Sequence, residues 1–166
     1  MRLSIAAGLA VLLLAAPAAA DKHHFEFMKK ETVGPLRLDM TEAQIAQALA
    51  GKPARGREQK WEADGLYHQK WSYGAQGLKL GMAAEKKGGA KTLASIECAA
   101  RCTLKTSRGI GIGSTLEDVQ KAYAAEFNKE DSKLPGAFVA GSIYGGLMIS
   151  FKGGKVDGMF LGPAAE

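Results

Sequence analysis

Few side chains in this sequence combine the types and the spacing that catalysis requires. The chain contains three histidines: His23 and His24 are adjacent, and His68 stands alone. It lacks the Gly-x-Ser-x-Gly, Ser-x-x-Lys and His-Glu-x-x-His motifs of common nucleophiles and zinc enzymes. The carboxylate pair Glu117-Asp118 is typical of a helix start, where negative charge complements the helix dipole. The sequence therefore predicts a protein that is not an enzyme and has no cofactor.

A glycine-rich run at 109–115, Gly-Ile-Gly-Ile-Gly-Ser-Thr, suggests an anion site, because glycines before a helix expose backbone N–H groups. The run lacks the Gly-Lys-Ser/Thr ending of a P-loop and the third glycine of a dinucleotide fingerprint. Its alternating isoleucines instead indicate a short strand that ends at a helix cap. We interpret it as a strand-to-helix junction.

The only two cysteines, Cys98 and Cys102, enclose Ala-Ala-Arg. An oxidising compartment favours a disulfide between them. A tight hairpin or one helical turn brings two such residues within bridging range. Closing so small a loop stabilises the fold by about 2 kcal/mol on the chain-entropy model. A structural disulfide is favoured over the alternative of a redox or metal site.

Residues 1–20 have the pattern of a signal peptide. Arg2 precedes the apolar run 9–14, and Ala18-Ala-Ala20 gives the small residues of a cleavage site. No cysteine follows the run, so the lipid-anchor residue of a bacterial lipoprotein is absent. We expect an exported protein, periplasmic or secreted.

Cleavage after Ala20 would create a candidate metal site at Asp21, Lys22 and His23. The free amine, two backbone amides and the imidazole can surround Cu(II) or Ni(II) in a square plane. Cleavage two residues earlier would abolish this site, and an ordinary terminus is the alternative.

The formal net charge is +5 at pH 7, and the densest basic stretch is 52–60. Such a stretch could contact an anionic lipid surface, a polysaccharide or an acidic protein. The alternative is a solvated loop. No motif indicates nucleic-acid binding.

One supersecondary pattern occurs twice, 74 residues apart. In the first copy, Leu36 and Leu38 alternate as in a strand, and Thr41 and Gln44 form a helix capping box. The second copy has Ile110 and Ile112, with Thr115 and Asp118 as its capping box, in the corresponding places. The apolar positions of each short helix also correspond: Ile45, Ala48 and Leu49, then Val119, Ala122 and Tyr123.

Strand-like segments follow each helix, at 59–63, 66–73, 78–83 and 92–98, and then at 137–143, 147–151 and 155–161. No helix-length segment separates them within a group, so we expect hairpins. The predicted fold is α+β: two tandem helix-plus-antiparallel-meander repeats that form one curved sheet with short helices on one face. The predicted organisation is an extended N-terminal segment (21–32), repeat 1 (33–104) and repeat 2 (105–166).

Four aromatic residues are candidate partner-binding anchors: Trp61, Tyr67, Trp71 and Tyr73. Aromatic side chains on a sheet face commonly anchor a protein partner. The alternative is that they fill the core between the sheet and the helices.

The alternating strand, the threonine cap, the short helix and the meander with Tyr-Gly and Gly-Lys-Val turns together resemble a known module. It is similar to the tandem module of the β-lactamase inhibitory protein family and to the small lipoprotein that assists outer-membrane β-barrel assembly. The resemblance covers most of 33–162 and is strongest at 109–123 and 153–161. It implies a curved sheet with helices on one face and a partner-binding surface on the other.

From these patterns we expect an exported, non-catalytic protein-binding module whose partner is an envelope or secreted protein. The alternative is a periplasmic protein that binds a small ligand or Cu/Ni.

Overall fold

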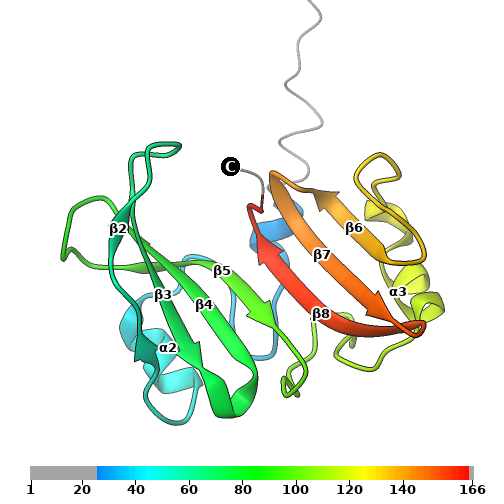
Figure 1. Cartoon of the computed structure of the whole chain (residues 1–166), viewed down its shortest axis with the longest axis horizontal. Helices are drawn as coiled ribbons and strands as arrows, with labels where there is room; N and C mark the ends of the chain where they lie inside the picture. The colour runs from blue at the N-terminus through cyan, green and yellow to red at the C-terminus, as the bar shows by residue number, and fades with distance from the viewer. Residues whose placement is uncertain (1–25, 165–166) are drawn as a thin grey trace, which may run out of the picture.

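The computed structural model describes residues 26–164 as an eight-stranded antiparallel sheet with a few short helices, which confirms the α+β class (Figure 1). A short helix at 26–30 opens the described chain. The later elements, in chain order, are α2 (Glu42–Ala48), β1 (Ala54–Arg55), β2 (Gln59–Lys60), β3 (Tyr67–Tyr73), the 3₁₀ turn η1 (Gly74–Gln76), β4 (Leu78–Ala84), β5 (Thr92–Cys98), α3 (Leu116–Ala122), the 3₁₀ turn η2 (Ala124–Glu126), β6 (Ala137–Ser142), β7 (Gly145–Lys152) and β8 (Lys155–Gly162).

The strand order is β1-β3-β4-β5-β8-β7-β6, with β2 paired to β3. Hairpins connect β3, β4 and β5, and then β6, β7 and β8, as the absence of helices between these segments predicts. The two groups join where β5 pairs with β8 in antiparallel register. Each predicted strand of the two meanders is present, although β2 is shorter than expected and β1 was not predicted.

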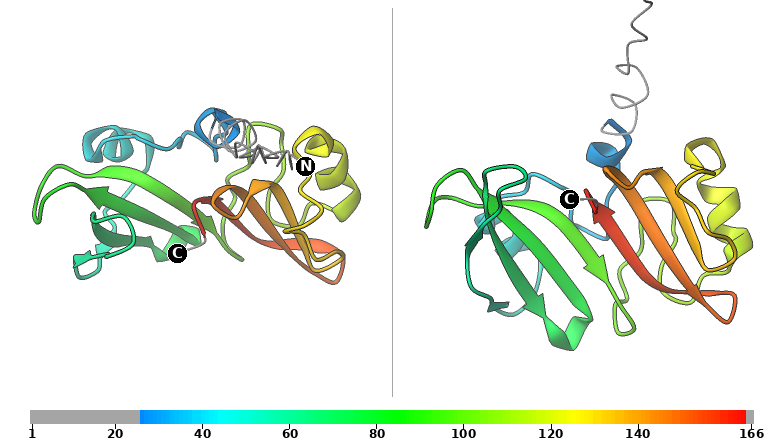
Figure 2. Two further views of the ribbon diagram at one scale, coloured as in Figure 1. Left: turned by 90° about the horizontal axis from the view of Figure 1, so that it is seen from above. Right: turned by 45° about the horizontal axis from the view of Figure 1, so that its top comes forward.

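Two rows of cross-strand neighbours on one face form most of the core. One row contains Trp71, Leu80, Ile96, Leu161, Leu147 and Ala140, and the other contains Tyr73, Leu78, Cys98, Met159, Ile149 and Phe138. All twelve residues are buried. Period-two alternation of strand side chains places them on the same face. Helix 26–30, α2 and α3 lie on one side of the sheet (Figure 2), and the buried Ile45 and Val119 of α2 and α3 belong to the same core cluster.

Each helix of the two halves begins at a capping box, as predicted. The Thr41 hydroxyl accepts from the Gln44 N–H, and the Gln44 side chain accepts from the Thr41 N–H. Thr115 and Asp118 make the same reciprocal bonds at α3. Both caps satisfy N–H groups that the first turn of a helix leaves unpaired.

Matching hydrogen bonds fix each cap to the last strand of its meander. Asp39 N–H donates to Leu93 O, and Leu93 N–H donates to Met40 O. In the second half, Gly113 N–H donates to Val156 O, and Val156 N–H donates to Ser114 O. Asp39 and Gly113 both have positive φ, 66° and 89°.

The strands predicted at 36–38 and 109–113 are wrong. The structure has turns and an isolated Val33–Leu36 bridge there. At the second site, the Ile110 N–H donates to Thr106 Oγ1 and its carbonyl accepts from the Thr106 N–H, so these groups close a local turn. The alternating apolar residues are nevertheless largely buried, because they pack under the helices as loop residues.

The prediction of an extended segment at 21–32 is wrong over its described part, because 26–30 is helical. This helix buries Phe27 and Met28, and the Glu31 N–H donates to Phe27 O. A helix of five residues is too short to show a helical periodicity in the sequence. The predicted signal peptide at 1–20 and the residues Asp21, Lys22 and His23 lie outside the described residues.

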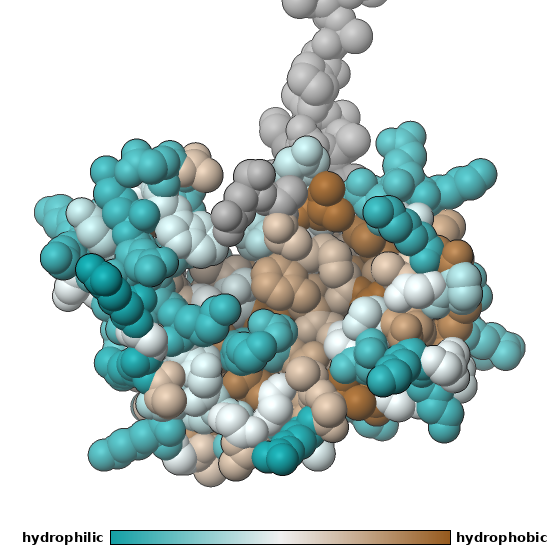
Figure 3. Space-filling view, in the orientation of Figure 1, coloured by the Kyte–Doolittle hydropathy of each residue, from teal (hydrophilic) through white to brown (hydrophobic). Residues whose placement is uncertain are grey.

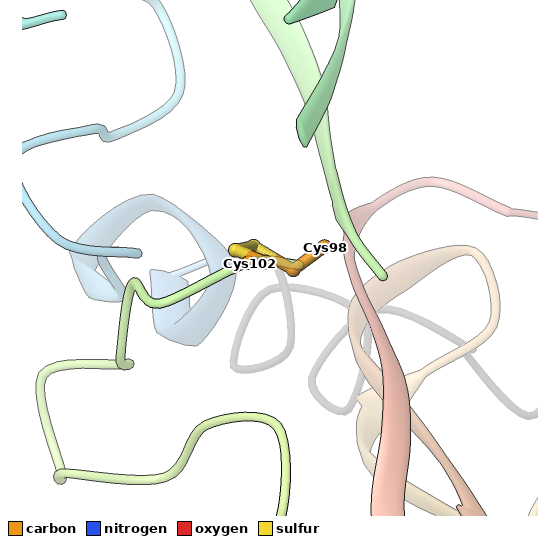
Figure 4. The surroundings of a disulfide bond; sticks show 2 residues. All are labelled: Cys98 and Cys102. Atoms are coloured by element: carbon orange, nitrogen blue, oxygen red, sulfur yellow. A yellow bond between two sulfur atoms is a disulfide. The ribbon is translucent and has the colours of Figure 1, made fainter. Parts of the chain in front are cut away.

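Cys98 and Cys102 are paired as a disulfide, as predicted, with Cα atoms 5.4 Å apart (Figure 4). Cys98 ends β5, and the turn after it is closed by the Cys102 N–H, which donates to Ala99 O. Both cysteines are buried in the core cluster. The pair therefore fastens the end of β5 to the segment that leads into the second half. Between residues 26 and 164, no helix is both long enough and apolar enough to cross a membrane.

Candidate binding face of the sheet

The structure divides the four predicted aromatic anchors between the core and the surface. Trp71 and Tyr73 are 1% and 6% exposed and belong to the buried rows, which was the alternative that the sequence left open. Trp71 also lies under the Arg55 guanidinium, 4.0 Å from the ring centroid. Tyr67 is half-buried. Trp61 is 38% exposed and is the one member of the set with a large free surface.

A tight turn before β3 holds Trp61 in this position. The Trp61 N–H donates to Leu66 O, and the Gly65 N–H donates to Trp61 O. The indole stacks on the His68 imidazole, with centroids 3.8 Å apart and an interplanar angle of 13°. His68 Nε2 lies 2.7 Å from Asp64 Oδ2, so the carboxylate fixes the imidazole beneath the indole.

The charge of Asp64 is stabilised by this turn. Partial burial acts to raise its pKa, but hydrogen bonds from the Leu66 N–H and from His68 outweigh burial and leave the pKa below its usual value. The carboxylate therefore stays ionised at neutral pH, and the stacked pair remains oriented.

A hollow of about 440 Å³ lies on the sheet face opposite the helices, over β3, β4, β5 and β8. Trp61, His68 and Phe160 contribute aromatic walls, and Gly81 and Ser95 contribute small surfaces. A Cβ at Gly81 would stand too close to Ser95 Oγ, so a larger residue there would require the serine side chain to move.

Three cationic side chains, Arg57, Lys70 and Lys79, approach this hollow beside the His68 imidazole. Lys79 Nζ is 2.6 Å from Glu97 Oε1, and His68 is held by Asp64. Arg57 and Lys70 have no carboxylate partner within 4.0 Å anywhere in the described chain. The hollow thus has two cations whose charge is not compensated by a neighbour.

A second, shallower depression of about 500 Å³ lies over the β6–β8 half of the same face. Its large, partly exposed apolar lining residues are Ile143, Met148 and Phe160. Phe160 and Glu97 line both depressions, so the two are adjacent. Figure 3 shows this face: hydrophilic side chains gather over β2, β3 and β4, and apolar ones gather toward β7 and β8.

The sequence analysis missed Lys79, Met148 and Phe160 as surface candidates. The signal was present in the alternation of each strand, because these residues occupy the positions between buried neighbours. What could not be read from the sequence was the strand order that brings residues of β4, β5 and β8 side by side.

A buried polar cluster on the helix side was also missed. Glu31 is buried and accepts hydrogen bonds from the Ser107 hydroxyl and the Tyr123 hydroxyl. Burial raises the pKa of Tyr123. Arg108 lies 4.7 Å above the Tyr123 ring and binds Glu126 through both terminal nitrogens. The cluster connects helix 26–30 to α3 and its preceding loop, which is a structural role.

Within 26–164, no group of three or more His, Cys, Asp or Glu side chains is arranged to hold a metal ion. Comparison with known proteins gave no match to a family model, to a curated protein or to a solved structure.

Proposed function

We propose that this chain is an exported, non-catalytic protein-binding module of the bacterial envelope that captures its partner with the helix-free face of the sheet. The observation that carries the proposal is the exposed Trp61, which is fixed on His68 at the wall of a hollow in that face. A rigid aromatic side chain beside a depression is the arrangement that protein interfaces use as an anchor.

The sequence supports the remaining parts of this proposal. The signal-peptide pattern at 1–20 supports export, and the paired cysteines are typical of an oxidising compartment. The matching capping boxes and cap-to-strand hydrogen bonds support the hypothesis of two tandem repeats. The resemblance to the β-lactamase inhibitory protein module supports a binding role for the open face without identifying the partner.

Photo-crosslinking in bacteria that express the full chain tests the proposal. A crosslinking residue is placed at Ser72 or Ser150, one in each half of the open face, and at Gln47 or Gln120 on the exposed surfaces of α2 and α3. We expect Ser72 and Ser150 to give a crosslink to the same envelope or secreted protein, and Gln47 and Gln120 to give none. Crosslinks of equal yield from both faces, or none from the open face, would contradict the proposal.

A second candidate is a small-ligand-binding protein, which the volume of the hollow favours. About 440 Å³ lies within the range of small-molecule pockets. Native mass spectrometry of the exported protein distinguishes the candidates. A bound small molecule that is lost in Trp61→Ala would support this second function.

A further inference from the structure

The open face changes from charged to apolar along one row of cross-strand neighbours. The row contains, in spatial order, Ser72, Lys79, Glu97, Phe160 and Met148, and it ends at Val139, which is buried. Its first three residues belong to β3, β4 and β5, and its last three belong to β8, β7 and β6. The change therefore occurs where the two halves of the sheet meet.

The charged half has a defined preference for negative charge. Lys70 lies directly opposite Gly81, which in turn lies opposite Ser95, and all three residues line the hollow. Arg57 lines the same hollow from the segment between β1 and β2. A carboxylate that enters the hollow would meet two unpaired cations, and would be flanked by the Trp61 indole.

We infer that the occupant of this face is one segment of a partner protein that is acidic at one end and apolar at the other. Its carboxylate lies in the hollow against Arg57 and Lys70. Its apolar side chains lie in the depression lined by Phe160, Met148 and Ile143. This inference rests on the proposed function and specifies the partner's chemistry.

The dimensions and the shape of the open face limit how long the bound segment is and what kind of molecule it belongs to. From Ser72 to Met148, four inter-strand steps of about 4.8 Å span roughly 19 Å of sheet, the length of about six residues of extended chain. The face is hollowed, so a protruding segment fits it better than a flat lipid surface does. Charge complementarity aligns the acidic end, and the apolar contacts supply most of the affinity.

Selection from a random dodecapeptide display library tests the inference on the full mature protein. Four proteins are compared: the natural chain, the double variant Arg57→Gln/Lys70→Gln, the variant Ile143→Lys, and a control. The control is Lys29→Gln/Lys52→Gln, which removes the same charge from exposed positions that do not line the hollow. All variants are first checked for an unchanged thermal unfolding midpoint, and Met148→Lys replaces Ile143→Lys if the latter fails to fold.

On the natural chain and the control, we expect enriched peptides with Asp or Glu at one end and aromatic or aliphatic residues at the other. Enrichment of the acidic residues should fall at least tenfold on the Arg57/Lys70 variant, while apolar enrichment persists. The Ile143 variant should show the reverse. Peptides recovered at this face without acidic enrichment would overturn the inference but not the proposed function.

Anionic vesicles of phosphatidylglycerol provide the second arm. Binding that is as strong as that of the selected peptides, and that is lost in Arg57→Gln/Lys70→Gln, would assign the face to a membrane surface and overturn the inference. Failure of every peptide, together with no crosslink from Ser72 or Ser150, would instead remove the proposed function itself.

Discussion

The half of the sheet formed by β3–β5 with α2 and the half formed by β6–β8 with α3 share their junctions and differ in their open faces. Both halves begin with a capped helix whose preceding residues bond to the last strand, and both contribute equally to the two buried rows. The open face is cationic in one half and apolar in the other. Folding uses matching junctions and buried rows in both halves, whereas the solvent-facing positions differ and so can define what is bound.

The largest expected effect separates the two tryptophans. Trp71→Ala should destabilise the protein by about 3–5 kcal/mol, because it removes a fully buried ring from the row that both halves share. Trp61→Ala should cost less than about 1 kcal/mol, since its indole stacks on His68 at the surface. Urea unfolding measures both values. Similar losses for the two variants would mean that Trp61 also belongs to the core.

The second prediction concerns the buried polar cluster around Glu31, which packs on α3 and has no counterpart beside α2. Glu31→Gln should destabilise by about 2 kcal/mol, because the Ser107 and Tyr123 hydroxyls lose a charged acceptor in a buried site. Glu130→Gln, an exposed carboxylate in the loop before β6, is the control and should change the free energy of unfolding by less than about 0.5 kcal/mol. Equal effects on the denaturation midpoint would rule out a structural role for the buried cluster.

The two junction residues with positive φ predict a smaller effect. Gly113→Ala should cost about 1 kcal/mol, because a Cβ has open space there and only the left-handed backbone opposes it. The matched control is Gly74→Ala, where the space is equally open and φ is not positive. Asp39→Gly should change stability little, since aspartate tolerates this conformation better than most residues. A loss for Gly74→Ala as large as for Gly113→Ala, measured by thermal unfolding, would refute the backbone explanation.

The smallest expected effect is the response of the two helix caps to low pH. Hydrogen bonds from Thr115 lower the pKa of Asp118, so its contribution to the α3 cap is present above the unfolded-state pKa of about 4 and is lost as pH falls through the lower folded-state pKa. Gln44 occupies the same place in α2 and does not titrate. Below pH 4 the hydrogen-exchange protection factors should therefore fall at the start of α3 more than at the start of α2. Asp118→Asn should make the two helices respond alike.

The sequence alone determined the elements that depend on interactions between residues close together in the chain. Thr41 with Gln44, and Thr115 with Asp118, indicate helix starts because each pair satisfies N–H groups within four residues of chain. Alternation and turn glycines gave β5 with its observed bounds, and four-residue spacing indicated the Cys98–Cys102 pair. The turns at 36–38 and 109–113 were misread as strands because apolar alternation does not reveal where backbone hydrogen bonds go.

Only the tertiary structure decided which aromatic residues are exposed and which open-face residues become neighbours. Tyr73 and Trp71 alternate with polar residues in sequence, but the helices packed on one face determine that their side is the core. Lys79, Glu97 and Phe160 are distant in the chain and adjacent in the sheet, because the register of β4, β5 and β8 aligns them. Strand pairing is a long-range property, so the cationic hollow and its apolar extension exist only once the two halves have joined.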